Sequence, residues 1–182
     1  MTEYEDRELI DIYSEDRISK GYTKPRHGEG SKLLPDEYMI YALGLLENNS
    51  GKFLITRRTL DKKWAAGAWE IPGGGASAGE TSLDAVRREV YEETGIDLEG
   101  LEPLSVYSYK NPDPDGGDNY FCDIFHFRID FEIDDVKIQP EEVSDYRLSD
   151  FLEMKKLSEK DGFLHFNRVT EALEAEAVFN KD

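Results

Sequence analysis

The sequence predicts an α/β protein built as a sandwich around a mixed β-sheet. Two observations lead to this prediction. Segments rich in β-formers and segments with helical periodicity are interspersed along the chain, and two of the β-rich segments are separated by only a short turn. The chain has 182 residues, the length of about one domain, so we expect a single main core.

The first seventy residues contain four predicted strands. Residues 8–13 alternate loosely between apolar and polar side chains and predict a short strand, whereas 18–36 carry several glycines and prolines and predict an irregular crossing loop. The segments 37–47 and 52–58 flank the turn NNSG and predict a hairpin. A short strand over 69–71 is followed directly by PGGG.

A helix is predicted from Thr81 to Thr94. Thr81 is a capping residue, and Asp84 three positions later forms an approximate capping box. Gly95 stands where a helix-terminating glycine belongs. Apolar residues recur at helical spacing along one face: Leu83, Val86 and Val90.

The second half of the chain adds further strands and two helices. The segments 101–110 and 119–129 predict strands on either side of a PDPDGGD loop, and 146–148 predicts a short strand. Residues 149–157 predict a short helix capped by its first residue, Ser149. An amphipathic helix over 165–179 closes the chain.

Acidic residues dominate the charge of the protein. Asp and Glu total 40 against 22 Lys and Arg, which gives a formal net charge of −18. Binding to nucleic acid or to an anionic membrane surface needs a basic face, so we expect neither partner. There is no apolar run of transmembrane length and no secretory signal at the N-terminus, so we expect a cytoplasmic protein. The single cysteine, Cys122, excludes an internal disulfide framework.

Three glutamates on the predicted helix form the most informative cluster. Glu89, Glu92 and Glu93 stand at i, i+3 and i+4, so their carboxylates share one face and repel one another. Two of them lie in the last turn, where the helix dipole favours cations instead. One explanation is a solvated acidic face on an acidic protein. The other is a hard divalent cation such as Mg²⁺, which takes carboxylate ligands and leaves positions for phosphate oxygens.

The residues around this cluster resemble a known signature. Gly74, Glu80 and the run Arg88-Glu89-Val90-Tyr91-Glu92-Glu93-Thr94-Gly95-Ile96 match every specified position of a Nudix box. The preceding residues 69–74, WEIPGG, resemble the usual lead-in to that box. The chain is therefore similar to Nudix hydrolases. The resemblance implies an α/β/α sandwich with a mixed sheet and a catalytic loop–helix–loop.

The resemblance also implies roles for individual residues. Glu89, Glu92 and Glu93 would bind Mg²⁺, with Mn²⁺ as the alternative, and the carbonyl of Gly73 would be a further ligand. Arg88 and Glu80 would brace the loop against the helix, and Glu89 would be a candidate catalytic base. Gly74 is expected beside the substrate, because a glycine lets the backbone approach a ligand closely.

Further candidates lie outside the box. A glutamate in the loop QPEEV, Glu142 or its neighbour Glu141, is a candidate additional ligand or base. Arg57 and Arg58 end a strand directed at the site, and strand alternation allows only one of them to face it. Tyr109 either stacks on a nucleobase or packs in the core.

The resemblance implies hydrolysis of a nucleoside diphosphate linked to another moiety, such as a nucleotide sugar or ADP-ribose. The alternatives are an oxidised or non-standard nucleoside triphosphate as substrate, and a non-catalytic nucleotide sensor. The N-terminal segments also resemble the branch that includes isopentenyl diphosphate isomerases, but the segment before the box has no cysteine, which those isomerases use. We expect residues 1–36 to be an N-terminal extension and 37–182 the Nudix domain. A homodimer is the oligomer that the resemblance suggests.

Overall fold

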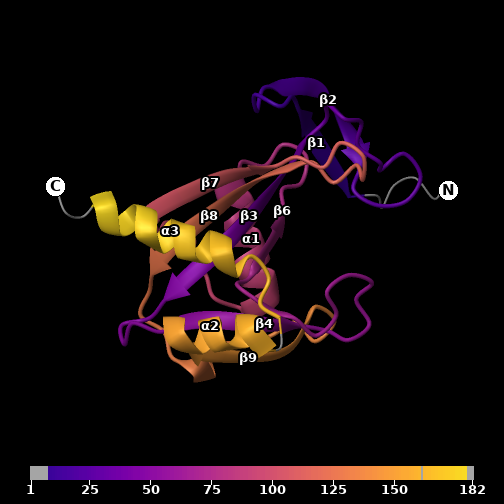
Figure 1. Cartoon of the computed structure of the whole chain (residues 1–182). Coiled ribbons are helices and arrows are strands. Elements are labelled where there is room, and N and C mark those ends of the chain that lie inside the picture. Colours follow the sequence, from indigo (N-terminus) through magenta and orange to yellow (C-terminus); the bar gives the residue numbers. More distant parts are fainter. Residues whose placement is uncertain (1–7, 161, 180–182) are drawn as a thin grey trace.

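Two groups of strands form the centre of the protein, of which a computed structural model describes residues 8–160 and 162–179 (Figure 1). In the first group, β3 (Met39–Glu47) lies between an antiparallel β6 (Gly73–Gly75) and a parallel β8 (Tyr120–Arg128), and β7 (Ser105–Asn111) pairs antiparallel with β8. In the second, β4 (Phe53–Arg58) lies between β5 (Trp69–Glu70) and β9 (Val143–Ser149), both antiparallel. One residue pair, Glu47 and Phe53, joins the groups. The predicted mixed sheet is confirmed.

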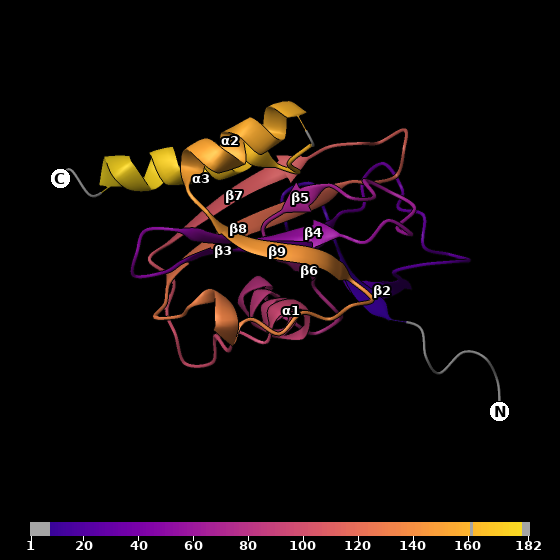
Figure 2. The ribbon, with the colours of Figure 1, turned by 90° about the horizontal axis from the view of Figure 1, so that it is seen from below.

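Helices cover both faces of the strands, as Figure 2 shows. On one face α1 (Ser82–Thr94) buries Val86 and Val90 against apolar side chains of β3 and β8. On the other face α2 (Phe151–Lys160) and α3 (Phe166–Phe179) bury Met154, Leu157 and Val169 in a second core. The expected α/β/α sandwich is therefore confirmed, and each face has its own apolar core.

The ends of α1 are determined by the residues that the sequence indicated. The side chain of Thr81 accepts the Asp84 N–H at 3.1 Å, and the Asp84 carboxylate accepts the Thr81 N–H at 3.0 Å. Gly95 ends the helix with a φ of 71°, in the left-handed region that favours glycine. Gly44 of β3 lets the helix pack closely, because a Cβ there would lie 2.8 Å from Val90 Cγ2.

The predicted hairpin of 37–47 with 52–58 is wrong in its pairing. The two segments do form β3 and β4 around a turn, but they pair only at Glu47 and Phe53. The reason is that β8 and β6 occupy the two edges of β3. The strand β4 separates from β3 after the turn and pairs with β5 and β9 instead.

Two local predictions also need correction, and one segment left unassigned forms a strand. The expected loop over 18–36 contains β2 (Ser19–Pro25), which pairs with β1 (Leu9–Tyr13). The glycines after Pro72 form the strand β6, because bare backbone fits against β3. The cap of α2 is Asp150 and not Ser149: its carboxylate accepts the Glu153 N–H at 2.8 Å, and Glu153 accepts the Asp150 N–H at 2.8 Å. A short 3₁₀ helix, Ile133–Asp135, lies between β8 and β9.

The hairpin of β1 and β2 lies at one end of the sheet, opposite the C-terminal end of α3 (Figure 1). The turn of the hairpin is fixed by Arg17, which makes two hydrogen bonds of 2.8 and 2.5 Å to the buried carboxylate of Asp123 on β8. The base of the hairpin contacts the loop before α1: the Ala78 N–H donates to the Leu9 carbonyl and the Gly79 N–H to Asp11. The hairpin therefore lies directly against the loop that leads to the three glutamates.

In the described part of the chain, none of the helices combines the length and the apolar character needed to cross a membrane.

Candidate active site

The glutamates of α1 differ in their exposure. Glu93 is only 9 % exposed, and its Oε2 accepts the backbone N–H of Gly73 at 3.2 Å. The side chain of Glu89 is 14 % exposed, whereas that of Glu92 is 51 % exposed. The helix therefore directs Glu89 and Glu93 inward and leaves Glu92 at the rim.

Two further carboxylates approach from the second strand group. Glu70, on β5, is largely buried, and its charge raises the pKa of Glu93. The charge of Glu142 also raises the pKa of Glu93. Glu142 lies in the loop before β9, and this loop is held near α1 by the Gln139 N–H, which donates to the Glu93 carbonyl at 3.2 Å. Glu141 is exposed. Of the two loop glutamates, Glu142 is the one whose charge acts on the cluster.

Glu70 was not among the residues nominated from the sequence. A signal for it exists, since Trp69 and Ile71 are both core residues and strand alternation turns the residue between them to the other face. Its partner Arg58, whose Nη1 lies 3.2 Å from Glu70 Oε1, comes from the adjacent strand β4. The sequence alone did not show that this face meets α1.

Burial raises the pKa of several carboxyl groups in the cluster. The pKa of Glu93 lies well above its ordinary value because the group is desolvated and because Glu70 and Glu89 place like charges beside it. Desolvation also raises the pKa of Glu89 and of Glu70, although the neighbouring Arg88 and Arg58 oppose this. These carboxylates are held together against their mutual repulsion, which marks a candidate functional site.

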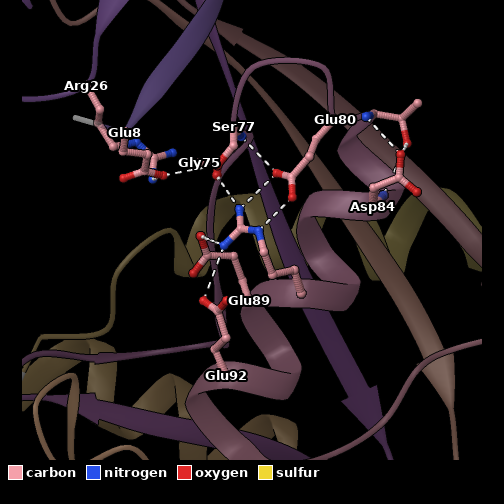
Figure 3. A network of polar contacts seen from close by, with 10 residues as sticks. Glu8, Arg26, Gly75, Ser77, Glu80, Asp84, Glu89 and Glu92 are labelled. Carbon is pink, nitrogen blue, oxygen red and sulfur yellow. Dashed lines mark hydrogen bonds and ion pairs between the residues drawn. The ribbon is translucent and has the colours of Figure 1, made fainter. Parts of the chain in front are cut away.

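Arg88 connects the loop, the helix and the cluster. Figure 3 shows its partners Gly75, Glu80, Glu89 and Glu92 around it. Its Nε and Nη2 donate to the two oxygens of Glu80 at 2.7 and 2.9 Å, and Nη2 also donates to the Gly75 carbonyl at 3.1 Å. Its Nη1 donates to Glu89 at 2.8 Å and to Glu92 at 3.3 Å. The pairing expected between Glu80 and Arg88 is confirmed. Glu80, in the loop before α1, therefore fixes Arg88, and Arg88 orients Glu89.

The glycines of β6 allow this close arrangement. Gly73 has a φ of 148°, and a Cβ on it would lie 2.3 Å from the Ala42 carbonyl oxygen. A Cβ on Gly74 would lie 2.4 Å from the Glu89 carboxyl carbon. Gly73 thus presents its N–H to Glu93, and Gly74 leaves the space that the Glu89 carboxylate occupies.

The other nominated residues are placed differently. Arg58 faces the cluster through Glu70, while Arg57 donates its Nε to the Gly67 carbonyl at 2.9 Å and lies over the ring of Trp69. Tyr109 is buried in the core under α3, and its hydroxyl lies 3.2 Å from Nδ1 of His165. The structure thus brings Glu70, Glu89, Glu93, Glu142 and Arg58 together, but not Arg57 or Tyr109.

The donor set suits a hard divalent cation. Within residues 8–160 and 162–179, no three acidic, histidine or cysteine side chains are already arranged as metal ligands, and Arg88 holds Glu89 and Glu92 by hydrogen bonds. The oxygen donors are nonetheless those that Mg²⁺ and Mn²⁺ prefer. A cation would also offset the like charges that raise the pKa of Glu93.

Comparison with known proteins agrees with this geometry. The NUDIX domain matches residues 37–170. An uncharacterised Nudix hydrolase of Listeria monocytogenes is 31 % identical over 159 residues, which cover 86 % of this chain and 88 % of the relative. An isopentenyl-diphosphate Δ-isomerase of Salmonella heidelberg is 35 % identical over 109 residues, covering 58 % of this chain and 59 % of the relative.

Solved structures share the fold. The crystal structure of a Deinococcus radiodurans protein superposes with a TM-score of 0.64 at 20 % sequence identity, covering 84 % of this chain and 90 % of that one. The matched range 37–170 includes Gly73, Gly74, Glu80 and the three glutamates of α1. The chain belongs to the Nudix hydrolase family, whose enzymes act on phosphoanhydride bonds.

Proposed function

We propose that the protein is a Mg²⁺-dependent pyrophosphohydrolase that cleaves the diphosphate linkage between a nucleoside and another moiety, as in a nucleotide sugar or ADP-ribose. One observation carries the proposal: the Glu93 carboxylate is 9 % exposed, and its pKa is raised by this burial and by the charges of Glu70 and Glu89. A divalent cation stabilises such a cluster, and a diphosphate is the substrate chemistry that needs one.

In this proposal Glu89, Glu92, Glu93 and the Gly73 carbonyl hold the ion. When bound, Mg²⁺ neutralises charge on the phosphate oxygens and activates the attacking water. Glu80 holds Arg88 through two hydrogen bonds, and Arg88 in turn holds Glu89 at 2.8 Å. The Gly73 N–H restrains Glu93 in the same way.

Two carboxylates are candidates for the base that takes the proton of water. Glu89 is supported by its burial, which raises its pKa and makes it a stronger base than an exposed glutamate. Glu142 is supported by its place beside Glu93, and it forms an ion pair with Lys62. Comparing the pH–rate profiles of Glu89→Gln and Glu142→Gln would identify which one acts.

Isomerase chemistry lacks support in this chain. The resemblance to isopentenyl diphosphate isomerases implies a cysteine before the box, and this chain has Ile71-Pro72-Gly73 there. Cys122 is buried in the core under α3, where burial raises the pKa of its thiol to about 12. A thiol with that pKa is a poor acid–base group near neutral pH.

The experiment is a phosphate-release screen with and without Mg²⁺. The panel contains ADP-ribose, nucleotide sugars, dinucleoside polyphosphates, canonical and oxidised nucleoside triphosphates, and isopentenyl diphosphate. We expect metal-dependent turnover of one diphosphate-linked nucleoside. Turnover only of triphosphates, with pyrophosphate released, would instead favour a nucleotide-pool enzyme. Silence across the panel with Mg²⁺ still bound would favour a nucleotide sensor.

Glu93→Gln provides the matched test of the metal assignment. We expect turnover to fall by at least about 100-fold, the scale of losing one strong electrostatic contributor. We expect the unliganded variant to melt at the same or a higher temperature, because a buried like charge is removed. Glu99→Gln, an exposed position just beyond the helix, is the control and should retain full activity. Full activity in Glu93→Gln would contradict the assignment.

A further inference from the structure

Arg26 is carried to the edge of the site by the N-terminal hairpin. It follows the end of β2, and its backbone N–H donates to the Glu8 carbonyl at 2.8 Å. Its side chain is 12 % exposed and lies on the bare backbone of Gly75, where a Cβ would come within 1.4 Å of Nη2. Figure 3 shows Arg26 and Glu8 beside the strand that leads to Ser77 and Glu80.

The guanidinium group is only partly satisfied. Nη1 pairs with Glu8 at 2.5 Å, but Nε and Nη2 are buried and have no hydrogen-bond partner within the described residues. These two nitrogens share one edge of the guanidinium, the edge that presents parallel N–H donors to a bidentate oxyanion. Buried donors without acceptors are costly, so this arrangement favours an acceptor that the side chain can reach.

The charge of Arg26 acts on two nearby titratable groups. Its charge lowers the pKa of Glu89 and that of Tyr41, in both cases against a larger effect of burial. Arg26 therefore lies within electrostatic reach of Glu89. It contacts the other face of β6, because a Cβ on Gly74 would point at Glu89 and a Cβ on Gly75 would point at Arg26.

The other cations near the cluster already have acidic partners. Arg88 is paired with Glu80, Glu89 and Glu92, Arg58 with Glu70, and Lys62 with Glu142. Of these four cations, Arg26 is the one with two buried nitrogens that have no hydrogen-bond partner among the described residues. A diphosphate substrate has more anionic oxygens than a metal ion alone satisfies, so it needs such a group.

We propose that Arg26 is a phosphate-binding residue of this site, which turns from the backbone of Gly75 toward a phosphate group of the substrate. The proposal rests on the proposed function for the nature of the anion. In the structure Nε and Nη2 are covered, so binding requires a rotation of the long side chain that lifts them off Gly75. The residue that donates hydrogen bonds to the phosphate then comes from the N-terminal hairpin, outside the matched range 37–170.

The test compares Arg26→Gln with Lys20→Gln. Lys20 is on the same hairpin and pairs with the exposed Asp36, so its variant removes the same charge away from the site. The probe is inorganic pyrophosphate with Mg²⁺, titrated by calorimetry, and KM and kcat are measured on the substrate that turns over. We expect Arg26→Gln to raise Kd and KM by about ten- to a hundredfold with a smaller effect on kcat, as for loss of a charged hydrogen bond. Lys20→Gln should change either by less than twofold.

A purely structural role of Arg26 predicts a different pattern. It would lower the melting temperature and leave the Kd for magnesium pyrophosphate unchanged, and that result overturns the proposal. Gly75→Ala pushes the guanidinium off the backbone while keeping its charge, so we expect Kd to fall or to stay within twofold. A rise as large as that in Arg26→Gln would contradict the proposed rotation. If Arg26→Gln does not fold, Arg26→Lys takes its place in the comparison with Lys20→Gln.

The two proposals fail separately. Turnover with an unchanged KM in Arg26→Gln leaves the proposed function intact and rejects the role of Arg26. Arg26-dependent pyrophosphate binding without any turnover across the panel rejects the proposed function and supports the anion site.

Discussion

Gly74→Ala tests whether the position of the Glu89 carboxylate governs turnover. Gly74 pairs with Ala42 of β3, and its φ lies outside the left-handed region, so alanine fits the backbone. A Cβ there would lie 2.4 Å from the Glu89 carboxyl carbon and 2.6 Å from each oxygen. Ordinary contact begins at 3.4 Å, so the carboxyl group has to move by about 1 Å.

The expected cost is functional rather than structural. The atoms that move are the end of a flexible side chain, so we expect a destabilisation of no more than about 1 kcal/mol, or about 2–4 °C in melting temperature for a chain of this size. A catalytic group that is misplaced by about 1 Å can cost about 100-fold in rate. We therefore expect kcat/KM to fall by about 100-fold on the substrate identified by the screen.

A double-mutant cycle with Glu89→Gln makes this prediction decisive. If Gly74→Ala acts through Glu89, adding it to Glu89→Gln changes kcat/KM by less than about threefold, because the group it displaces no longer acts. The assay measures steady-state kinetics and thermal melting of the four proteins side by side. Fully additive losses, or a drop of more than about 10 °C in melting temperature, would show that the reasoning is wrong.

Two further predictions follow from the ion pairs. Asp123→Asn leaves Arg17 without its partner, and since one partner is buried and the other a third exposed, we expect a loss of about 3 kcal/mol and about 6–12 °C in melting temperature at pH 7. Burial raises the pKa of Asp123, but Arg17 and Ser108 outweigh this effect and hold the pKa below its ordinary value. The stabilisation is therefore present above about pH 4 and is lost as the pH falls further. The difference in melting temperature between variant and wild type should close in acid, and a difference independent of pH would contradict this. Arg58→Gln removes the partner of Glu70 and should lower kcat/KM by about tenfold, on the scale of a charged hydrogen bond. Arg57→Gln, at the neighbouring position, should change kcat/KM by less than about threefold. Equal effects of the two variants on kcat/KM would contradict the placement of Arg58 toward the cluster.

The local structure around the site could be predicted from the sequence in detail. The limits of α1, its capping box and its terminal glycine all follow from hydrogen bonds between residues a few positions apart. The same holds for the shared face of Glu89 and Glu93 and for the pairing of Glu80 with Arg88, which spans eight residues. Wherever a contact lies within one loop and one helix, the spacing of residue types was sufficient.

Contacts between distant segments could not be predicted in this way. The hairpin expected from 37–47 and 52–58 separates because β8, from more than seventy residues away, occupies an edge of β3. Glu70 and Glu142 join the cluster because β4 pairs with both β5 and β9. Arg57 and Arg58 look alike in the sequence, and the pairing and packing of their strand decide which one faces the carboxylates.

The sequence by itself therefore determined the family signature, the helix that carries it and the carboxylates on one face of that helix. Only the tertiary structure decided which additional charges surround those carboxylates, and it alone brought Arg26 to Gly75 across nearly fifty residues. The physical reason is that helix caps and periodicity depend on neighbouring residues, whereas burial and pKa shifts depend on every segment that the sheet brings together.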